Sequence, residues 1–254
     1  MIDFSKKRAE QVLKKASLDM YNKKIAFFSD QLSILNVNIF ILKKVLQFPF
    51  EIFVSLGENV FFSWVVRNFY EHSVLVISRL FIDEGGDVFT LPRFKNWVFS
   101  HMKSQYLSGY KMRLKSLKLD SKTREVRDKV KDLRKKIVVH INREIALGMD
   151  SVRNVSVEEL EGLVEKLNSI LDAVAFDVEY EMFPLPYIDT VIYPEGSTHS
   201  KDIDAILDSI AKNSSLLNMP EENPTGWQIT KESLDDEYLK KNNTYRKKFG
   251  LREA

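Results

Sequence analysis

The chain contains no cysteine, which excludes disulfide bonds, thiolate nucleophiles and cysteine-ligated zinc sites. Its four histidines are scattered along the sequence and give no all-histidine metal site. No Walker-type loop, nucleophile elbow or dinucleotide-binding glycine pattern occurs, so nucleotide hydrolysis and serine hydrolysis have no support. We therefore expect a protein that uses neither a metal ion nor a cofactor.

Long apolar runs and a large charge of one sign are also lacking. The most apolar region, residues 36–80, is interrupted by charged residues and by Pro49, so we expect no transmembrane helix. The N-terminus has no uninterrupted apolar segment of the secretory type. A formal net charge of +2 excludes a strongly basic nucleic-acid coat protein but not a local basic patch. We predict a cytoplasmic protein without membrane contact.

Glycine and proline are scarce, with nine and seven copies, and most of them fall between segments of helical periodicity. Strand patterns are nearly absent; the best is the short segment 190–193. The composition of 44% hydrophobic and 29% charged residues is typical of a folded protein with a real core. The sequence thus predicts an all-α protein, a bundle of long helices.

Capping residues place several of the helix boundaries. Asp120 and Ser121 open one helix, Ser156 and Glu159 form a capping box that opens another, and Thr90 is a predicted N-cap. The predicted helices cover 5–47, a stretch from Pro49 to about 82, a short helix after Thr90, one through about 117, 121–147, 157–181, 201–212 and 232–242. Residues 83–87 are predicted as a turn.

The composition changes after Met182, because five of the seven prolines lie from residue 184 onward. We predict a helical core domain over 1–183 and a partly helical C-terminal extension over 184–254. Several aromatic residues of the extension indicate that it wraps the core or contacts a partner: Trp227, Tyr238, Tyr245 and Phe249.

The helix 121–147 carries the most suggestive chemistry. Its apolar stripe is formed by Val126, Val130, Leu133, Ile137, Ile141 and Ile145. Arg134 and His140 lie on opposite flanks of this stripe, and Glu144 lies close to it, one turn beyond His140. A fixed cation near a group that titrates around neutral pH suits phosphodiester cleavage. The alternative is an arginine that extends to solvent and a histidine that satisfies a backbone carbonyl.

The segment Leu133–Ile141 resembles the R-x(4–6)-H signature of HEPN domains, in particular their abortive-infection branch. The stretch Tyr70–Asp83, with its R-L-x-x-D ending, and the short helix after Thr90 are similar to the same branch. The resemblance covers about residues 5–182. It implies an antiparallel HEPN-like helical bundle that dimerises, so that the signature helices of two copies form one composite cleft.

Many members of this family are metal-independent endoribonucleases of phage-defence and toxin–antitoxin systems. The resemblance therefore implies RNA as substrate, a homodimer and a cognate antitoxin. By position, Arg134 and His140 are the catalytic pair. His140 would activate the ribose 2′-hydroxyl or protonate the leaving oxygen, and Arg134 would hold the scissile phosphate. Cleavage would leave a cyclic phosphate and a 5′-hydroxyl.

Lys135 departs from the family, which usually has Asn, Asp or His directly after the arginine. Lysine can contact phosphate, or it can mark a member that binds RNA without cutting it. The alternative function is accordingly an inactive RNA- or protein-binding module, and the plainest one is a structural helical protein. The predicted accessory residues are Lys135, Glu144, Glu71 and His72. The predicted RNA-binding residues, from the basic segment 111–136, are Lys111, Arg113, Arg127 and Lys131; a solvated helix face would have the same composition.

The acidic residues Asp83, Glu84 and Asp87 stand close together with glycines between them. This arrangement lacks the spacing of a calcium loop, and we interpret it as a plain turn rather than a metal site.

Overall fold

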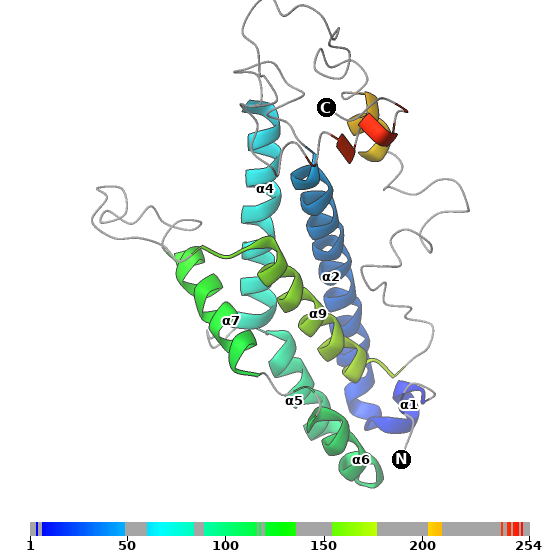
Figure 1. Cartoon of the computed structure of the whole chain (residues 1–254). Coiled ribbons are helices and arrows are strands. Elements are labelled where there is room, and N and C mark those ends of the chain that lie inside the picture. Colours follow the sequence, from blue (N-terminus) through cyan, green and yellow to red (C-terminus); the bar gives the residue numbers. More distant parts are fainter. Residues whose placement is uncertain are drawn as a thin grey trace, which may run out of the picture. The chain divides into compact units, whose positions relative to one another are not determined.

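The computed structural model describes residues 4, 7–48, 60–83, 89–115, 117, 120–135, 154–176 and 203–209, with 240, 243–244, 246–248 and 250 near the C-terminus. These residues are mostly helical and include no strand, which confirms the all-α prediction. The strand predicted at 190–193 lies outside them. The elements are α1 (Ala9–Val12), η2 (Lys15–Ser17), α2 (Leu18–Gln47), α4 (Val60–Ile77), η3 (Ser78–Ile82), α5 (Leu91–His101), α6 (Ser104–Lys115), α7 (Ser121–Leu133) and α9 (Val157–Val174) (Figure 1).

The chain divides into two compact units. The first combines Met1–Ile39 with Tyr70–Pro186, and the second combines Phe40–Phe69 with Tyr187–Ala254. The long helices α2 and α4 each contribute residues to both units. Every candidate site residue named above belongs to the first unit.

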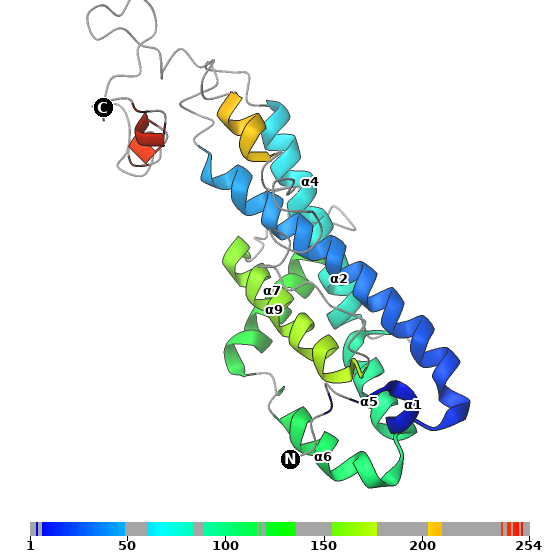
Figure 2. The same cartoon turned by 90° about the vertical axis from the view of Figure 1, so that its right-hand side faces the viewer.

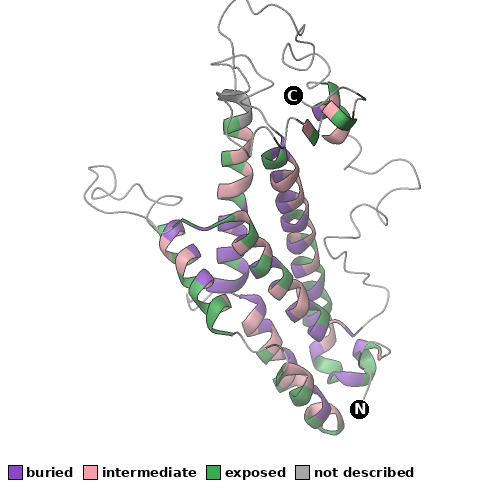
Figure 3. Cartoon of the chain, viewed as in Figure 1, coloured by how far each residue is buried: buried purple, intermediate pink, exposed green. Residues whose placement is uncertain are grey.

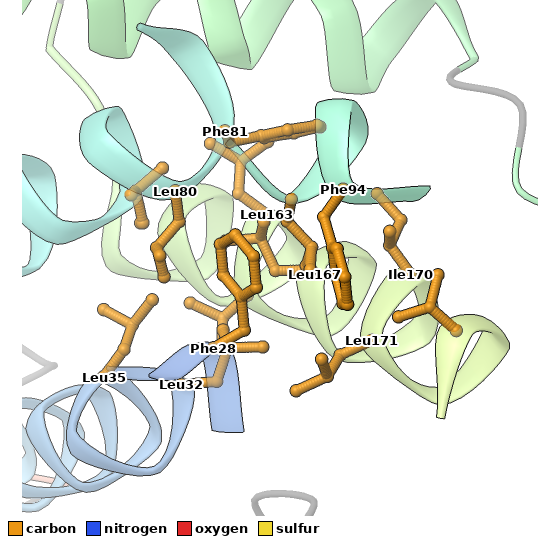
Figure 4. Close-up of a cluster of buried hydrophobic side chains, with 14 of the residues drawn as sticks. Phe28, Leu32, Leu35, Leu80, Phe81, Phe94, Leu163, Leu167, Ile170 and Leu171 are labelled. Atoms are coloured by element: carbon orange, nitrogen blue, oxygen red, sulfur yellow. The ribbon is translucent and has the colours of Figure 1, made fainter. Parts of the chain in front are cut away.

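The core of the first unit is built from the apolar faces of α2, α5, α9 and η3. α5 packs on both α9 and η3, and α7 packs on the same two elements. Figure 4 shows side chains from these elements meeting in one cluster. Its labelled members are Phe28, Leu32 and Leu35 of α2, Leu80 and Phe81 of η3, Phe94 of α5, and Leu163, Leu167, Ile170 and Leu171 of α9. Burial of this apolar surface is the main force that holds the helices together.

α2 and α9 also share polar contacts inside this core. The side-chain amides of Asn36 and Asn168 bond to each other in both directions, at 3.0 and 3.4 Å. Asn36 is only 1% exposed, so its amide needs such partners to offset the loss of water. Figure 2 shows the two helices running alongside each other, and Figure 3 shows buried positions recurring along both.

The single helix predicted over 5–47 is wrong at its N-terminal end. Leu13 leaves the helical conformation and forms an antiparallel bridge with Met102. The Lys14 N–H donates to the His101 carbonyl at 3.0 Å, and the Lys103 N–H donates to the Val12 carbonyl at 2.9 Å. These bonds join two distant breaks in the chain, the one before α2 and the one between α5 and α6. Partners 89 residues apart leave no mark in a local periodicity.

The helix predicted over 157–181 ends earlier than expected, at Val174. Ala175 is extended, and the chain turns Phe176 into the core, where it is 1% exposed. The hydroxyl of Tyr21 in α2 stabilises this end: it donates to the Val174 carbonyl at 3.0 Å and accepts from the Phe176 N–H at 3.1 Å. A buried side chain from another helix thus replaces the hydrogen bonds that further helix would supply.

The predicted caps are confirmed where they depend on neighbouring residues. The Asp120 carboxylate accepts from the Thr123 N–H at 2.7 Å. Ser156 and Glu159 form the expected reciprocal capping box, with distances of 2.9 and 3.1 Å. Thr90 has the extended backbone of an N-cap and Pro92 follows within the first turn, but the Thr90 side chain makes no capping hydrogen bond. The Asp120 and Ser156 side chains each satisfy an amide that a helix start leaves free.

In the second unit, the described residues include Leu42 and Val45 of α2 and Phe48 directly after it, all of which are buried. Residues 203–209 are helical, within the segment predicted at 201–212, and Leu207 is buried. The Lys44 ammonium lies 3.3 Å from the Asp204 carboxylate.

The stretch Lys15–Gln47 is long and apolar enough to cross a membrane. However, 44% of its most apolar window is buried inside the protein, and a core helix of a soluble protein has the same composition. The length and composition of this helix therefore decide nothing about location.

Candidate functional site

Arg134 directly follows α7 and begins a short turn of π-helical backbone shared with Lys135. Val126, Val130 and Leu133 are buried on the inner face of α7, as the predicted stripe requires. Lys135 is exposed. Because Leu133 anchors the end of the helix in the core, the backbone of Arg134 starts from a fixed position. The guanidinium group is then placed by its own side-chain contacts.

Asp83 supplies such a contact. It follows η3, a π-helix whose Leu80, Phe81 and Ile82 are buried, and its N–H donates to the Ser78 carbonyl at 2.9 Å. π-Helical turns are rare in proteins, but those that occur are often found at functional sites. They change the direction of the residues that follow. The two stretches of π-helical backbone in the described chain are η3, which Asp83 directly follows, and the one that begins at Arg134.

The Arg134 guanidinium donates through Nη1 to Oδ1 of Asp83 and forms an ion pair with it. The Asp83 side chain is 17% exposed and that of Arg134 is 32% exposed. The carboxylate is therefore largely withdrawn from water, while the guanidinium keeps partial access to it. Arginine has five donor hydrogens, and this contact uses one nitrogen of the fork. The structure thus brings Asp83, the last residue of the segment Tyr70–Asp83, together with Arg134, which the sequence singled out separately.

The other half of the predicted catalytic pair, His140, lies outside the described residues, as does Glu144. The predictions for both residues remain predictions. The same holds for the outer part of the apolar stripe, at Ile137, Ile141 and Ile145.

Glu71 and His72 lie on α4, three turns before Asp83 along the chain. Glu71 is half-buried and His72 is exposed. The His72 Nδ1 lies 2.6 Å from the Asn38 side-chain amide of α2, and Asn38 itself is 7% exposed. A ring held by a buried amide already has a structural role as a link between α2 and α4.

The predicted RNA-binding residues come from two differently packed helices. Lys111 and Arg113 lie on α6, which packs on α5, whereas Arg127 and Lys131 lie on α7, which packs on α9 and η3. Lys111 and Lys131 are exposed. Arg113 donates to the Asp172 carbonyl at 2.7 Å, and Arg127 lies 3.3 Å from the carboxylate of Asp128. Of the four, the two lysines reach solvent most fully.

A groove of about 820 Å³ runs between α7 and α9. Its charged lining consists of Asp120, Glu158, Glu159 and Glu165 on the acidic side and Lys122 and Lys166 on the basic side. The excess of carboxylates makes this groove unfavourable for a phosphate backbone.

Sequence reasoning missed the role of Asp83, which it treated as part of a turn. The only signal was its place after the buried Leu80–Ile82 run, in the R-L-x-x-D phrase. Its partner lies 51 positions away, and no local pattern links the two. Over the described part of the chain, no group of three or more histidine, aspartate or glutamate side chains is arranged to hold a metal ion.

Comparison with protein-family models, with curated proteins and with solved structures finds no match for this chain. Functional interpretation therefore depends on its own residues.

Proposed function

We propose that the protein is a metal-independent endoribonuclease of the HEPN type, in which Arg134 and His140 act on the phosphodiester. One observation carries the proposal: Arg134 is held by Asp83 at the end of a core-packed helix, yet about a third of its side chain stays exposed. An arginine in this state can offer its remaining donors to an oxyanion without first being ordered.

In the proposed reaction, His140 takes the proton of the ribose 2′-hydroxyl, whose oxygen attacks the adjacent phosphorus. The bond from phosphorus to the 5′-oxygen breaks, and that oxygen leaves as a hydroxyl after the protonated His140 gives it the proton taken from the 2′-hydroxyl. The products are a 2′,3′-cyclic phosphate and a 5′-hydroxyl. Arg134 stabilises the negative charge that builds on the phosphoryl oxygens.

A second copy of the chain would complete a composite cleft, and a defence or toxin role with a cognate antitoxin follows from the resemblance alone.

A second function is favoured by a separate observation. Lys135 is exposed immediately after Arg134, where an active family member usually has a shorter polar residue. Two adjacent cations favour tight phosphate binding, which is what a catalytically silent RNA-binding module requires. This module would use the same Arg134 surface but would leave RNA intact.

The test is cleavage of end-labelled total RNA in EDTA by the full-length protein. We expect wild type to produce fragments with cyclic phosphate ends and His140→Ala to lose at least about a hundredfold in rate, as is typical for a general acid–base residue. His101→Ala is the matched control. His101 stacks on Trp97 with ring centroids 4.2 Å apart, on a helix remote in sequence from Arg134, and its loss should leave cleavage unchanged.

Arg134→Lys tests the second residue of the pair, because lysine keeps the charge but loses the fork geometry. Arg124→Lys is the matched control, because it makes the same change at an exposed position on α7 and should leave cleavage unchanged. A folded wild type that binds RNA but never cuts it would exclude the nuclease and leave the binding module.

A further inference from the structure

We infer that Asp83 is a positioning residue that orients the Arg134 guanidinium toward RNA phosphate. The inference rests on the role of Arg134 as a phosphate ligand, which both proposed functions share. It concerns a residue that the proposed chemistry does not itself require.

The first step is that Asp83 is rigidly placed. The π-helical bond from its N–H to the Ser78 carbonyl fixes where its side chain begins. The preceding residues of η3, Leu80, Phe81 and Ile82, are at most 6% exposed and anchor the segment in the core. The Asp83 carboxylate therefore has little freedom to move. The Arg134 side chain must adopt the conformation that reaches it.

The second step is that the pair is not needed to join α7 to η3. Val130 and Leu133 of α7 are buried in the same apolar cluster as Leu80 to Ile82 of η3, and α7 packs on η3. A carboxylate that is 17% exposed, by contrast, has lost much of its hydration, and its ion pair with Arg134 offsets part of that cost. Within the described residues, Asp83 is the ionic partner that the structure gives to Arg134. The arrangement therefore does little for packing but determines the direction of the guanidinium.

The third step concerns the sign of the charge. An aspartate beside a phosphate-binding arginine lowers the local positive potential and, by charge alone, weakens RNA binding. The carboxylate strengthens binding only if orienting the arginine outweighs this repulsion. A long arginine side chain loses much rotational freedom when it binds, and a pre-oriented one loses less. Positioning and simple charge neutralisation thus predict opposite effects when Asp83 is replaced.

The experiment measures affinity for a 2′-O-methyl RNA oligonucleotide, which lacks the attacking hydroxyl and cannot be cleaved by this route. The full-length protein is used, with folding checked by circular dichroism. Arg134→Ala should weaken binding about tenfold to a hundredfold, the range for one charge-assisted contact, and should reduce the salt dependence by about one ion. We expect Asp83→Asn to weaken binding about threefold to tenfold, although it removes a negative charge.

Asp83→Glu is the variant that separates geometry from charge. It keeps the carboxylate and the net charge but moves the charge by one methylene, and it should also weaken binding about threefold. Glu125→Gln is the matched control, because it removes one exposed carboxylate from α7 whose partner Lys129 keeps its contact with Glu159. This control should leave binding unchanged or tighten it slightly. In the Arg134→Ala background, neither Asp83 variant should have a further effect.

Tighter binding by Asp83→Asn, no change in Asp83→Glu, or equal effects with and without Arg134 would each overturn the inference. A wild type that does not bind the oligonucleotide would overturn it together with the phosphate role of Arg134. A wild type that binds but fails to cut natural RNA removes only the nuclease proposal, and the Asp83 comparison still decides the present one.

Discussion

Two buried tyrosines of the first unit allow one chemical change to be made in two different environments. Tyr21 and Tyr110 are 1% and 0% exposed, and both rings lie against Phe176, with centroids 5.9 and 6.0 Å from it. The Tyr21 hydroxyl bonds to the Val174 carbonyl and the Phe176 N–H. The Tyr110 hydroxyl has no hydrogen-bond partner in the described part of the chain. Burial raises the pKa of Tyr110 above its usual range, so it remains a neutral phenol.

Replacing Tyr21 by phenylalanine leaves two buried backbone groups without their partner. An unsatisfied buried group costs about 1–3 kcal/mol, so the free energy of unfolding should fall by about 2–4 kcal/mol after some relaxation. For a unit of this size such a change lowers Tm by roughly 6–12 °C. Tyr110→Phe removes a polar atom that is buried without compensation, and it should be neutral or should stabilise by about 1 kcal/mol.

Both variants are measured by urea unfolding of the full-length protein, with equal m values required before midpoints are compared. The volume change is the same in both, so the difference between them reports hydrogen bonding alone. Equal losses in the two variants would refute this reasoning. A loss above about 1 kcal/mol in Tyr110→Phe would show that its hydroxyl has a partner elsewhere in the chain or in bound water.

Three further changes test the α7–α9 region. Gly162 lies within α9 with no atom within 4 Å of an added Cβ, so Gly162→Ala should raise the free energy of unfolding by about 1 kcal/mol in a thermal melt. The Lys129 ammonium at 2.8 Å holds the pKa of Glu159 below its usual value of 4.5. The stability that Glu159 contributes is thus present above pH 4.5 and is lost as pH falls through the lowered pKa; Glu159→Gln should flatten acid unfolding in this range. Partial desolvation raises the pKa of Asp172, although the residue is exposed, so its charged form slightly destabilises the fold at pH 7. Asp172→Asn should therefore stabilise slightly at pH 7, and this gain should shrink as pH falls below the raised pKa.

Features set by neighbouring residues could be predicted from this sequence, and features set by distant residues could not. The caps at Asp120 and Ser156 depend on groups within three positions, and the structure has them as expected. The buried stripe at Val126, Val130 and Leu133 follows from helical periodicity in the same way. Each of these depends on one turn of helix, which the local sequence specifies.

The helix ends at Leu13 and Val174 were missed because the deciding groups come from other elements. Leu13 pairs with Met102, and the Tyr21 hydroxyl replaces the hydrogen bonds that would continue α9. In both cases the local propensity allows more helix, and a tertiary contact ends it. The candidate site likewise has one residue that the local sequence reveals and one that only a tertiary contact reveals. Arg134 was found from its place on a helix flank, whereas Asp83 becomes its partner only when η3 packs against α7.

This nonlocal origin changes how variants of Arg134 must be interpreted. Arg134→Ala removes the proposed phosphate ligand, but it also leaves the largely buried Asp83 carboxylate without its ion pair, which costs stability. We expect the single variant to lose about 1–2 kcal/mol of unfolding free energy, and the double variant Asp83→Asn with Arg134→Ala to regain part of it, because no buried charge is then left unpaired. Arg127→Ala offers the contrast, since its partner Asp128 is its exposed chain neighbour and the pair contributes little to stability. If the double variant proves less stable than Arg134→Ala alone, Asp83 has bonds beyond Arg134, and its effect on RNA could not be assigned to the arginine. The expected order of stability is wild type, then the double variant, then Arg134→Ala as the least stable. Only this order allows a loss of RNA binding in Arg134→Ala to be divided between a loss of folding and a loss of recognition.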